Sequence, residues 1–167
     1  MGKLTRPRIA LPLSRPEIIL EAVALFGLLV LLSYCAYAWP SLPERIPTHF
    51  GIENTPDAWG GKHALLILPG VGTVLYLLLT IVGHFPHFYN YPIRITEENA
   101  LRQYRLARML VAMLKVPLIW MFAYLERMTV QVAVGNASQL DGRVMVIFLV
   151  ALFGLITGYL ILAFRQR

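Results

Sequence analysis

The sequence has few charged residues and only one cysteine. Charged side chains make up 14% of its 167 residues, while 57% of the residues are hydrophobic. Soluble domains carry about a quarter charged residues, so this shortage excludes an ordinary soluble domain. The lone Cys35 excludes an intramolecular disulfide, and it says nothing about the redox compartment.

The sequence also lacks the motifs of common enzyme classes. It contains no phosphate-binding loop, no glycine fingerprint for nucleotides and no Ser-His-Asp order. His49, Asp57 and His63, with Glu53 nearby, are residue types that bind zinc, but their spacing matches no compact metal motif. We therefore expect no catalysis, no metal and no cofactor, and we keep a metal or hydrolytic site in this region as an alternative.

Four apolar windows dominate what is present. Each holds about 20 residues, enough for a helix to cross a hydrocarbon core of about 30 Å. The windows cover about 18–39, 63–85, 106–125 and 144–164. We predict an all-α polytopic membrane protein in which residues 1–167 form a single four-helix transmembrane domain.

The basic residues behind the net charge of +6 are distributed unevenly around these windows. One side carries Lys3, Arg6, Arg8, Arg15, Arg94, Arg102, Arg105, Arg108, Lys115, Arg165 and Arg167; the other carries Arg45, Lys62, Arg127 and Arg143. The positive-inside rule then places both termini in the cytoplasm and the connection between the first two helices outside. We predict a multi-pass protein of the bacterial plasma (inner) membrane, whose basic excess serves topology and lipid contact and not nucleic-acid binding.

The outer connection, residues 41–62, is about 22 residues long and has neither a helical nor an alternating period. Unpatterned loops of this length are usually functional or disordered. Three prolines restrict its backbone and lower the entropy lost on ordering, so we predict an ordered lid on the outer membrane surface. We expect His49 and Asp57 to bond the loop backbone, and Phe50 and Trp59 to hold the loop at the membrane surface.

The third helix is predicted to begin before it enters the bilayer. The stretch "TEENALRQYRLARMLVAMLK" starts polar and becomes apolar without a break, which indicates an interfacial extension. Its Arg102, Arg105 and Arg108 are candidates for contact with anionic lipid headgroups. Ordinary inside-positive anchoring, without specific lipid recognition, remains the alternative for all three.

Two further pairs of residues are candidates for roles inside the bilayer. Lys115 is interpreted as the deepest charge, and Glu21 of the first helix is within reach of it, so we predict a structural ion pair, with a proton or ion path as the alternative. Gly154 and Gly158 are four residues apart and permit close approach of helices. We expect them to pack within the bundle, with dimerisation as the alternative.

The stretch "LPERIPTHFGIENTPDAWGGK" resembles the signature of a bacterial and archaeal membrane-domain family, domain of unknown function 1648, which also forms the leading part of SdpI-type toxin-immunity proteins. The residues that carry the resemblance are Pro43, Ile46, Pro47, His49, Phe50, Pro56, Asp57, Trp59, Gly60 and Lys62. Gly51 and Asn54 depart from the usual pattern, yet both residue types tolerate the left-handed backbone of a turn. The resemblance implies a short, stand-alone member without the second helical half of SdpI-type proteins.

This resemblance brings no established chemistry with it. We therefore expect a non-catalytic binding or accessory subunit that acts through its outer loop and helix faces. Its expected partners are the lipid bilayer and a protein partner or larger membrane complex. An immunity, sensor or signalling protein similar to the SdpI type is the alternative, and a metal-dependent membrane enzyme or transporter is a further one.

Overall fold

A computed structural model describes residues 6–166, so the basic residues Lys3 and Arg167 counted above lie outside the described residues. Four helices make up most of it: α1 (Arg15–Ala38), α2 (Ile67–Gly83), α3 (Ala100–Ala133) and α4 (Gly142–Arg165). All four are long and apolar enough to cross a membrane. The predicted all-α, multi-pass fold class is confirmed.

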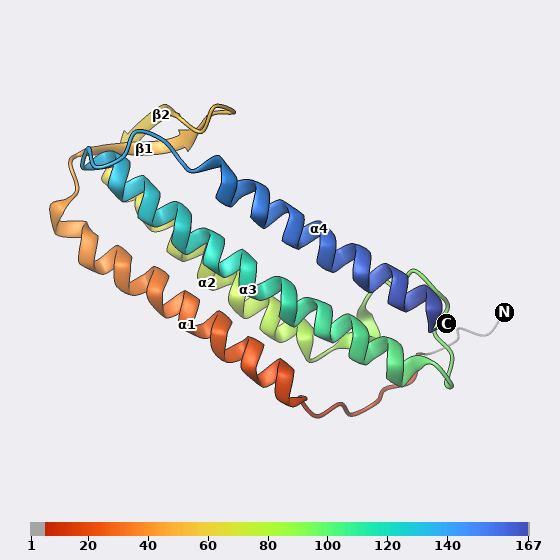
Figure 1. The fold of residues 1–167 in the computed structure, drawn as a ribbon. Coiled ribbons are helices and arrows are strands. Elements are labelled where there is room, and N and C mark those ends of the chain that lie inside the picture. Colours follow the sequence, from red (N-terminus) through yellow and green to blue (C-terminus); the bar gives the residue numbers. More distant parts are fainter. Residues whose placement is uncertain (1–5, 167) are drawn as a thin grey trace.

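Helix α3 occupies the centre of the bundle and contacts each of the other three helices (Figure 1). Helices α1 and α2 also touch each other, whereas α4 packs chiefly against α3. A small sheet caps one end of the bundle, which we call the hairpin end (Figure 1). The opposite end, the basic end, exposes Arg6, Arg8, Arg15, Arg94, Arg102, Arg105 and Arg165.

Two apolar clusters form the core: one joins α1, α2 and α3, and the other joins α1 and α3 to the hairpin and to the segment before α2. The first, in the middle of the bundle, contains Ala24, Leu28, Leu31, Tyr76, Ile119 and Ala123. The second, nearer the hairpin end, contains Cys35, Ala38, Leu42, Ile46, Leu65 and Val130. A Cβ atom at Gly72 would come within 2.7 Å of Leu31, so the absence of a side chain lets α2 approach α1 closely. No residue in the apolar window of α4 is buried, which suits a helix that faces lipid.

Helix α3 is longer than its predicted span. Its 34 residues extend about 51 Å, more than the roughly 30 Å of a hydrocarbon core. The helix runs unbroken from Ala100, as the predicted extension requires, with Pro117 inside it. It begins after a turn in which Thr96 and Asn99 bond each other's backbone N–H, at 2.9 and 3.3 Å, so the first turn has fixed partners.

The predicted ordered loop contains a β-hairpin, which the sequence analysis did not foresee. Strand β1 (Arg45–Phe50) pairs antiparallel with β2 (Pro56–Gly61). The register shifts around His49 explain why no alternating pattern was visible in the sequence. Asn54 adopts a φ of 63° in the turn, the left-handed conformation that the turn was expected to keep.

The connection between α2 and α3 is tied to the N-terminal segment at the basic end. The guanidinium of Arg6 lies 5.4 Å from the ring centroid of Tyr91 and donates to the carbonyl oxygen of Tyr89. The hydroxyl groups of Tyr89 and Tyr91 donate to the carbonyls of Val82 and Pro86, at 3.0 and 2.8 Å. Burial raises the pKa of Tyr89 to about 12 and also raises the pKa of Tyr91, so both phenols stay neutral donors.

Candidate functional site

The hairpin brings His49 and Asp57 together on its exposed surface. Nδ1 of His49 lies 2.6 Å from Oδ1 of Asp57, and the two side chains are 67% and 52% exposed. The expectation that both bond the loop backbone is corrected, because strand pairing places them side by side. Gly51 leaves room for this pair, since a Cβ there would lie 2.9 Å from Oδ2 of Asp57.

Other residues of the hairpin are anchored on the helices. Ile46 is fully buried and packs with Leu65 and Val130, while Pro47 beside it is also buried. The turn is held as well, because the N–H of Leu140, in the α3–α4 connection, donates to the carbonyl of Asn54 at 2.9 Å. The hairpin therefore keeps a fixed position over the bundle.

The residues that end the hairpin add polar anchors. The ammonium of Lys62 lies 3.5 Å from the carboxylate of Glu44 and 5.7 Å from the ring centroid of Trp39. Trp59 is 44% exposed and Phe50 is half-buried, so Trp59 is the more available of the two aromatic side chains. Pro43 and Gly60 belong to the same segment, and a Cβ at Gly60 would lie 2.8 Å from Thr48.

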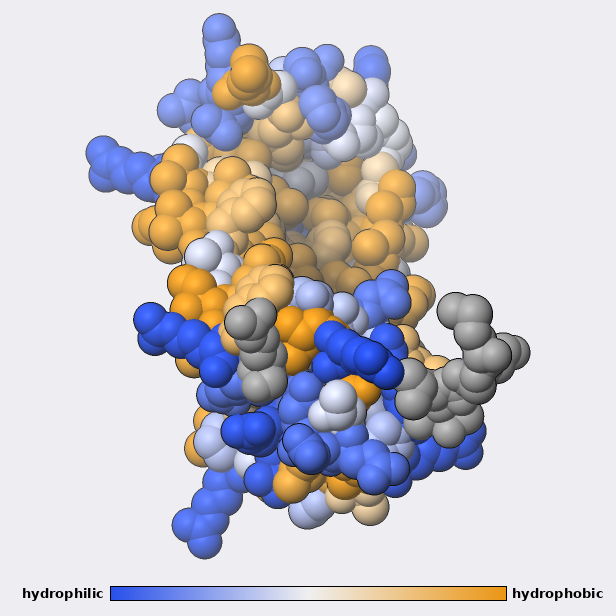
Figure 2. Space-filling model, turned by 90° about the vertical axis from the view of Figure 1, so that its right-hand side faces the viewer, coloured by the Kyte–Doolittle hydropathy of each residue, from blue (hydrophilic) through white to orange (hydrophobic). Residues whose placement is uncertain are grey.

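A cavity of about 320 Å³ lies beneath the hairpin, between β1 and three of the helices. Its lining is mostly apolar, and Thr48, His49 and Thr129 supply the polar groups. Figure 2 shows a hollow in the apolar band of the molecule, below the mixed surface of the hairpin end and above the hydrophilic basic end. Ligand pockets usually span about 300–1,000 Å³, so this cavity suits a small or slender ligand.

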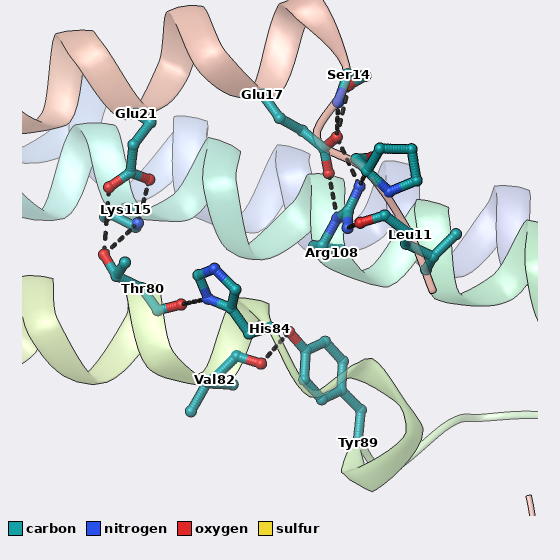
Figure 3. A network of polar contacts seen from close by, with 11 residues as sticks. Leu11, Ser14, Glu17, Glu21, Thr80, Val82, His84, Tyr89, Arg108 and Lys115 are labelled. Carbon is teal, nitrogen blue, oxygen red and sulfur yellow. Dashed lines mark hydrogen bonds and ion pairs between the residues drawn. The ribbon is translucent and has the colours of Figure 1, made fainter. Parts of the chain in front are cut away.

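A cluster of two ion pairs lies toward the basic end, where α1 and α3 face each other (Figure 3). Oε1 of Glu17 accepts from Nε of Arg108 at 2.6 Å, and both side chains are buried. Arg108 also donates to the carbonyls of Leu11 and Pro12, at 2.6 and 2.8 Å. Arg108 thereby fixes the N-terminal segment, and its predicted contact with lipid headgroups is wrong because its guanidinium is enclosed.

The second ion pair is the one predicted between Glu21 and Lys115, whose Oε2 and Nζ atoms lie 2.5 Å apart. Helix α2 completes it, because the Lys115 ammonium donates to Thr80 at 2.8 Å and the Tyr76 hydroxyl donates to Glu21 at 2.5 Å. These partners compensate the cost of placing charge at membrane depth. The pair therefore links all three core helices.

A small cavity of about 110 Å³ separates the two ion pairs, and His84 forms part of its wall. Nδ1 of His84 donates to the carbonyl of Thr80 at 2.8 Å, which leaves Nε2 as the acceptor in the neutral ring. Figure 3 shows the ring of His84 lying between the ion pairs. This arrangement suits a few hydrogen-bonded water molecules, because polar side chains form part of the wall and the volume is sufficient.

Sequence reasoning missed Glu126, which lies on α3 toward the hairpin end. Its side chain is fully buried, and neither carboxyl oxygen has a hydrogen-bond partner among the described residues. Its position could have been found, because Arg108, Lys115 and Glu126 are separated by 7 and 11 residues, close to whole numbers of helical turns. All three therefore lie on one face of α3, and that face points into the bundle.

The remaining predicted sites are the glycine pair of α4 and two arginines at the start of α3. Nothing lies within 4 Å of a Cβ placed at Gly154 or Gly158, so their predicted packing within the bundle is wrong. The reason is that this part of α4 is turned away from α3. Arg102 and Arg105 are exposed at the basic end, and their contact with headgroups stays a prediction.

The described part of the chain contains no group of three or more His, Cys, Asp or Glu side chains placed to hold a metal ion. His63, one of the suggested ligands, lies against the ring of Trp39 at 5.5 Å between centroids. The paired His49 and Asp57 therefore lack a third ligand from this set.

Comparison with known proteins agrees with this architecture. The family model described as "Domain of unknown function (DUF1648)" matches residues 26–73, which cover the second half of α1, the hairpin and the start of α2. An uncharacterized protein of Archaeoglobus fulgidus is 31% identical over 159 residues, covering 87% of this chain and 81% of that protein. The chain belongs to the DUF1648 family. No solved structure matches it. The matched residues include the hairpin and Leu65 but not Val130, Leu140, Lys115 or Glu126, so the hairpin is the part of the candidate site that the family model covers.

Proposed function

We propose that this DUF1648 protein is a non-catalytic binding or accessory subunit of a membrane complex, and that its hairpin receives a protein partner. The observation that carries the proposal is the contrast between the buried and the exposed side chains of the hairpin. Ile46 and Pro47 are buried and hold the hairpin on the bundle, whereas the side chains of His49, Asp57 and Trp59 remain largely exposed. A rigid element with an exposed aromatic residue and a polar pair has the composition typical of protein interfaces.

Binding, and not catalysis, is the role that suits this surface. The imidazole of His49 is oriented by Asp57, but no third metal ligand of the His, Cys, Asp or Glu type accompanies this pair among the described residues. The order of the hairpin also favours binding, because a preformed surface loses little conformational entropy when a partner docks. An immunity or sensor role would use the same surface, with a toxin or signal as its partner.

We place the protein in the plasma membrane, with the hairpin outside and both termini in the cytoplasm. The support is the concentration of exposed arginines at the basic end. Cysteine placed at Ala137, in a chain without Cys35, should react with an impermeant reagent added outside cells, and cysteine at Gln166 should react only after lysis. The reverse labelling would overturn this orientation.

Photo-crosslinking in native membranes tests the binding role. Benzoylphenylalanine at Trp59 replaces one exposed aromatic side chain by another and should give an adduct with one identified protein. The same residue at Val150, on the exposed face of α4, is the matched control and should give lipid adducts only. The identified protein must also crosslink to position 59 when the two purified proteins are mixed. Lipid adducts alone at position 59 would refute the proposal.

A further inference from the structure

Glu126 is the one buried carboxyl group in the described chain that has no cation to pair with. It is 0% exposed, both of its carboxyl oxygens lack a hydrogen-bond partner, and it belongs to none of the ion pairs. An ionised carboxylate in such surroundings is costly, because neither water nor a positive charge compensates it. The neutral acid avoids that cost, since it carries no charge to be solvated.

The basic residues of α3 nearest in sequence to Glu126 are either paired with other carboxylates or exposed. Lys115 is 11 residues from Glu126, about 16 Å along the helix axis, and it pairs with Glu21. Arg108 lies farther away and pairs with Glu17. Arg127 follows Glu126 directly, but its side chain is exposed, on another face of α3.

The elements around this part of α3 offer no compensating charge either. From α1 the thiol of Cys35 packs against the carboxyl group. From the hairpin and the segment before α2, Ile46 and Leu65 are apolar members of the cluster that contains Cys35. The other titratable groups at this end of the bundle have partners or are exposed: His49 with Asp57, Lys62 with Glu44, His63 against Trp39, Tyr34 with Gln131, and Tyr37, Arg45 and Arg143 exposed.

We propose that Glu126 is a proton-binding site enclosed in the membrane-spanning bundle, and that release of its proton opens the bundle beneath the hairpin. On release the O–H bond breaks, its electron pair stays on the carboxylate, and the proton passes to water. The carboxylate then needs water, and the cavity beneath the hairpin offers open space beside this part of α3. Leu125 and Thr129, which flank Glu126 on α3, line that cavity.

The sign of the pH effect follows from the number of bound protons. The closed structure holds one proton on Glu126 that the open, hydrated structure releases. The open form is therefore favoured as pH rises, and its equilibrium constant grows about tenfold per pH unit once release begins. Below that range the closed form prevails, and pH has no further effect through this site.

Infrared spectroscopy of the purified protein tests the proton directly. At neutral pH the wild type should show the carbonyl stretch of a neutral carboxyl group, and Glu126→Gln should lack it. Glu21→Gln is the matched control and should keep the band, because the native Glu21 is paired with Lys115. A wild-type spectrum without this band would overturn the proposal. If Glu126→Gln does not fold, Glu126→Met serves in its place.

The single cysteine tests the opening. Cys35 is 6% exposed, so a thiol reagent should reach it faster when the bundle opens. The labelling rate of wild type, divided by that of Glu126→Gln at the same pH, should rise up to about tenfold per pH unit above the range of proton release. Ionisation of the thiol at higher pH raises the labelling rates of both proteins, so it does not by itself raise their ratio. In the wild type an ionised Glu126 would also disfavour the thiolate of Cys35, which would lower the ratio. A ratio that stays constant with pH would overturn the coupling.

Discussion

The two halves of the helix bundle accommodate buried carboxyl groups in different ways. Toward the basic end, Glu17 and Glu21 each meet a cation of α3 at 2.6 and 2.5 Å. Toward the hairpin end, Glu126 of α3 itself meets apolar side chains and a thiol. The difference indicates a division of labour: the paired half holds three helices together, and the unpaired half can respond to a change in its surroundings.

Breaking the pair that is buried on both sides should have the largest effect. Arg108→Leu leaves the Glu17 carboxylate unpaired and releases two carbonyls of the N-terminal segment, so unfolding in mild detergent should become easier by about 3–5 kcal/mol. Thermal unfolding measures the change. Arg105→Leu, one turn away and exposed, is the control. Equal stability of the two variants would contradict an ion pair that holds the helices.

The second ion pair should show coupling in a double-mutant cycle. Lys115→Leu and Glu21→Leu each leave one partner without its charge, whereas the double variant removes both charges together. The double variant should therefore recover about 0.5–3 kcal/mol relative to the sum of the single changes. Unfolding curves of the four proteins give this number, and strictly additive losses would show that the pair contributes nothing.

Charge on the surface of the basic end should matter less than charge inside it. Arg102→Gln and Arg105→Gln should each reduce the stabilisation by phosphatidylglycerol, added to protein in neutral detergent, by at most about 1 kcal/mol. Arg143→Gln, exposed at the hairpin end, is the control and should respond like wild type. Unchanged lipid dependence of all three variants would leave the arginines as topological anchors only.

The smallest effect is expected at the unpaired carboxyl group. Glu126→Gln replaces a neutral acid by an amide of the same shape, so stability at neutral pH should change by less than about 1 kcal/mol. The same substitution at Glu17 removes the charge that Arg108 needs and should destabilise clearly. Unfolding measured side by side sharpens the comparison between the halves. A large loss of stability from Glu126→Gln would show that this carboxyl group needs its charge as Glu17 does, and the two halves would then not differ.

The helices and one ion pair could be predicted because their causes are local or follow from solvation. Apolar length defined the four spans, and the high cost of a lone charge in a membrane predicted a partner for Lys115. The hairpin could not be seen, because prolines and register shifts remove the alternation that reveals a strand. The pairing of Arg108 was missed for another reason: a position near a helix start suggests headgroups, and only the fold shows which side it faces.

The errors at Gly154 and Glu126 have a common cause. Sequence spacing tells which residues share a helix face, but it does not tell which face meets another helix. Gly154 and Gly158 share a face that turns away from the other helices, whereas Lys115 and Glu126 share a face that turns inward. A search for charged residues at whole numbers of turns along α3 would have found Glu126 from the sequence.

The hydrogen bond from Leu140 to Asn54 has a consequence for how the chain is made. It joins residues 86 positions apart, so the hairpin is synthesised long before its turn can complete its bonding. In the interval α2 and α3 must enter the membrane and the connection to α4 must emerge beside the hairpin. A chain released before residue 140 would carry every strand residue and still leave the turn unfastened. Assembly of the hairpin end is thus completed only by the connection between α3 and α4.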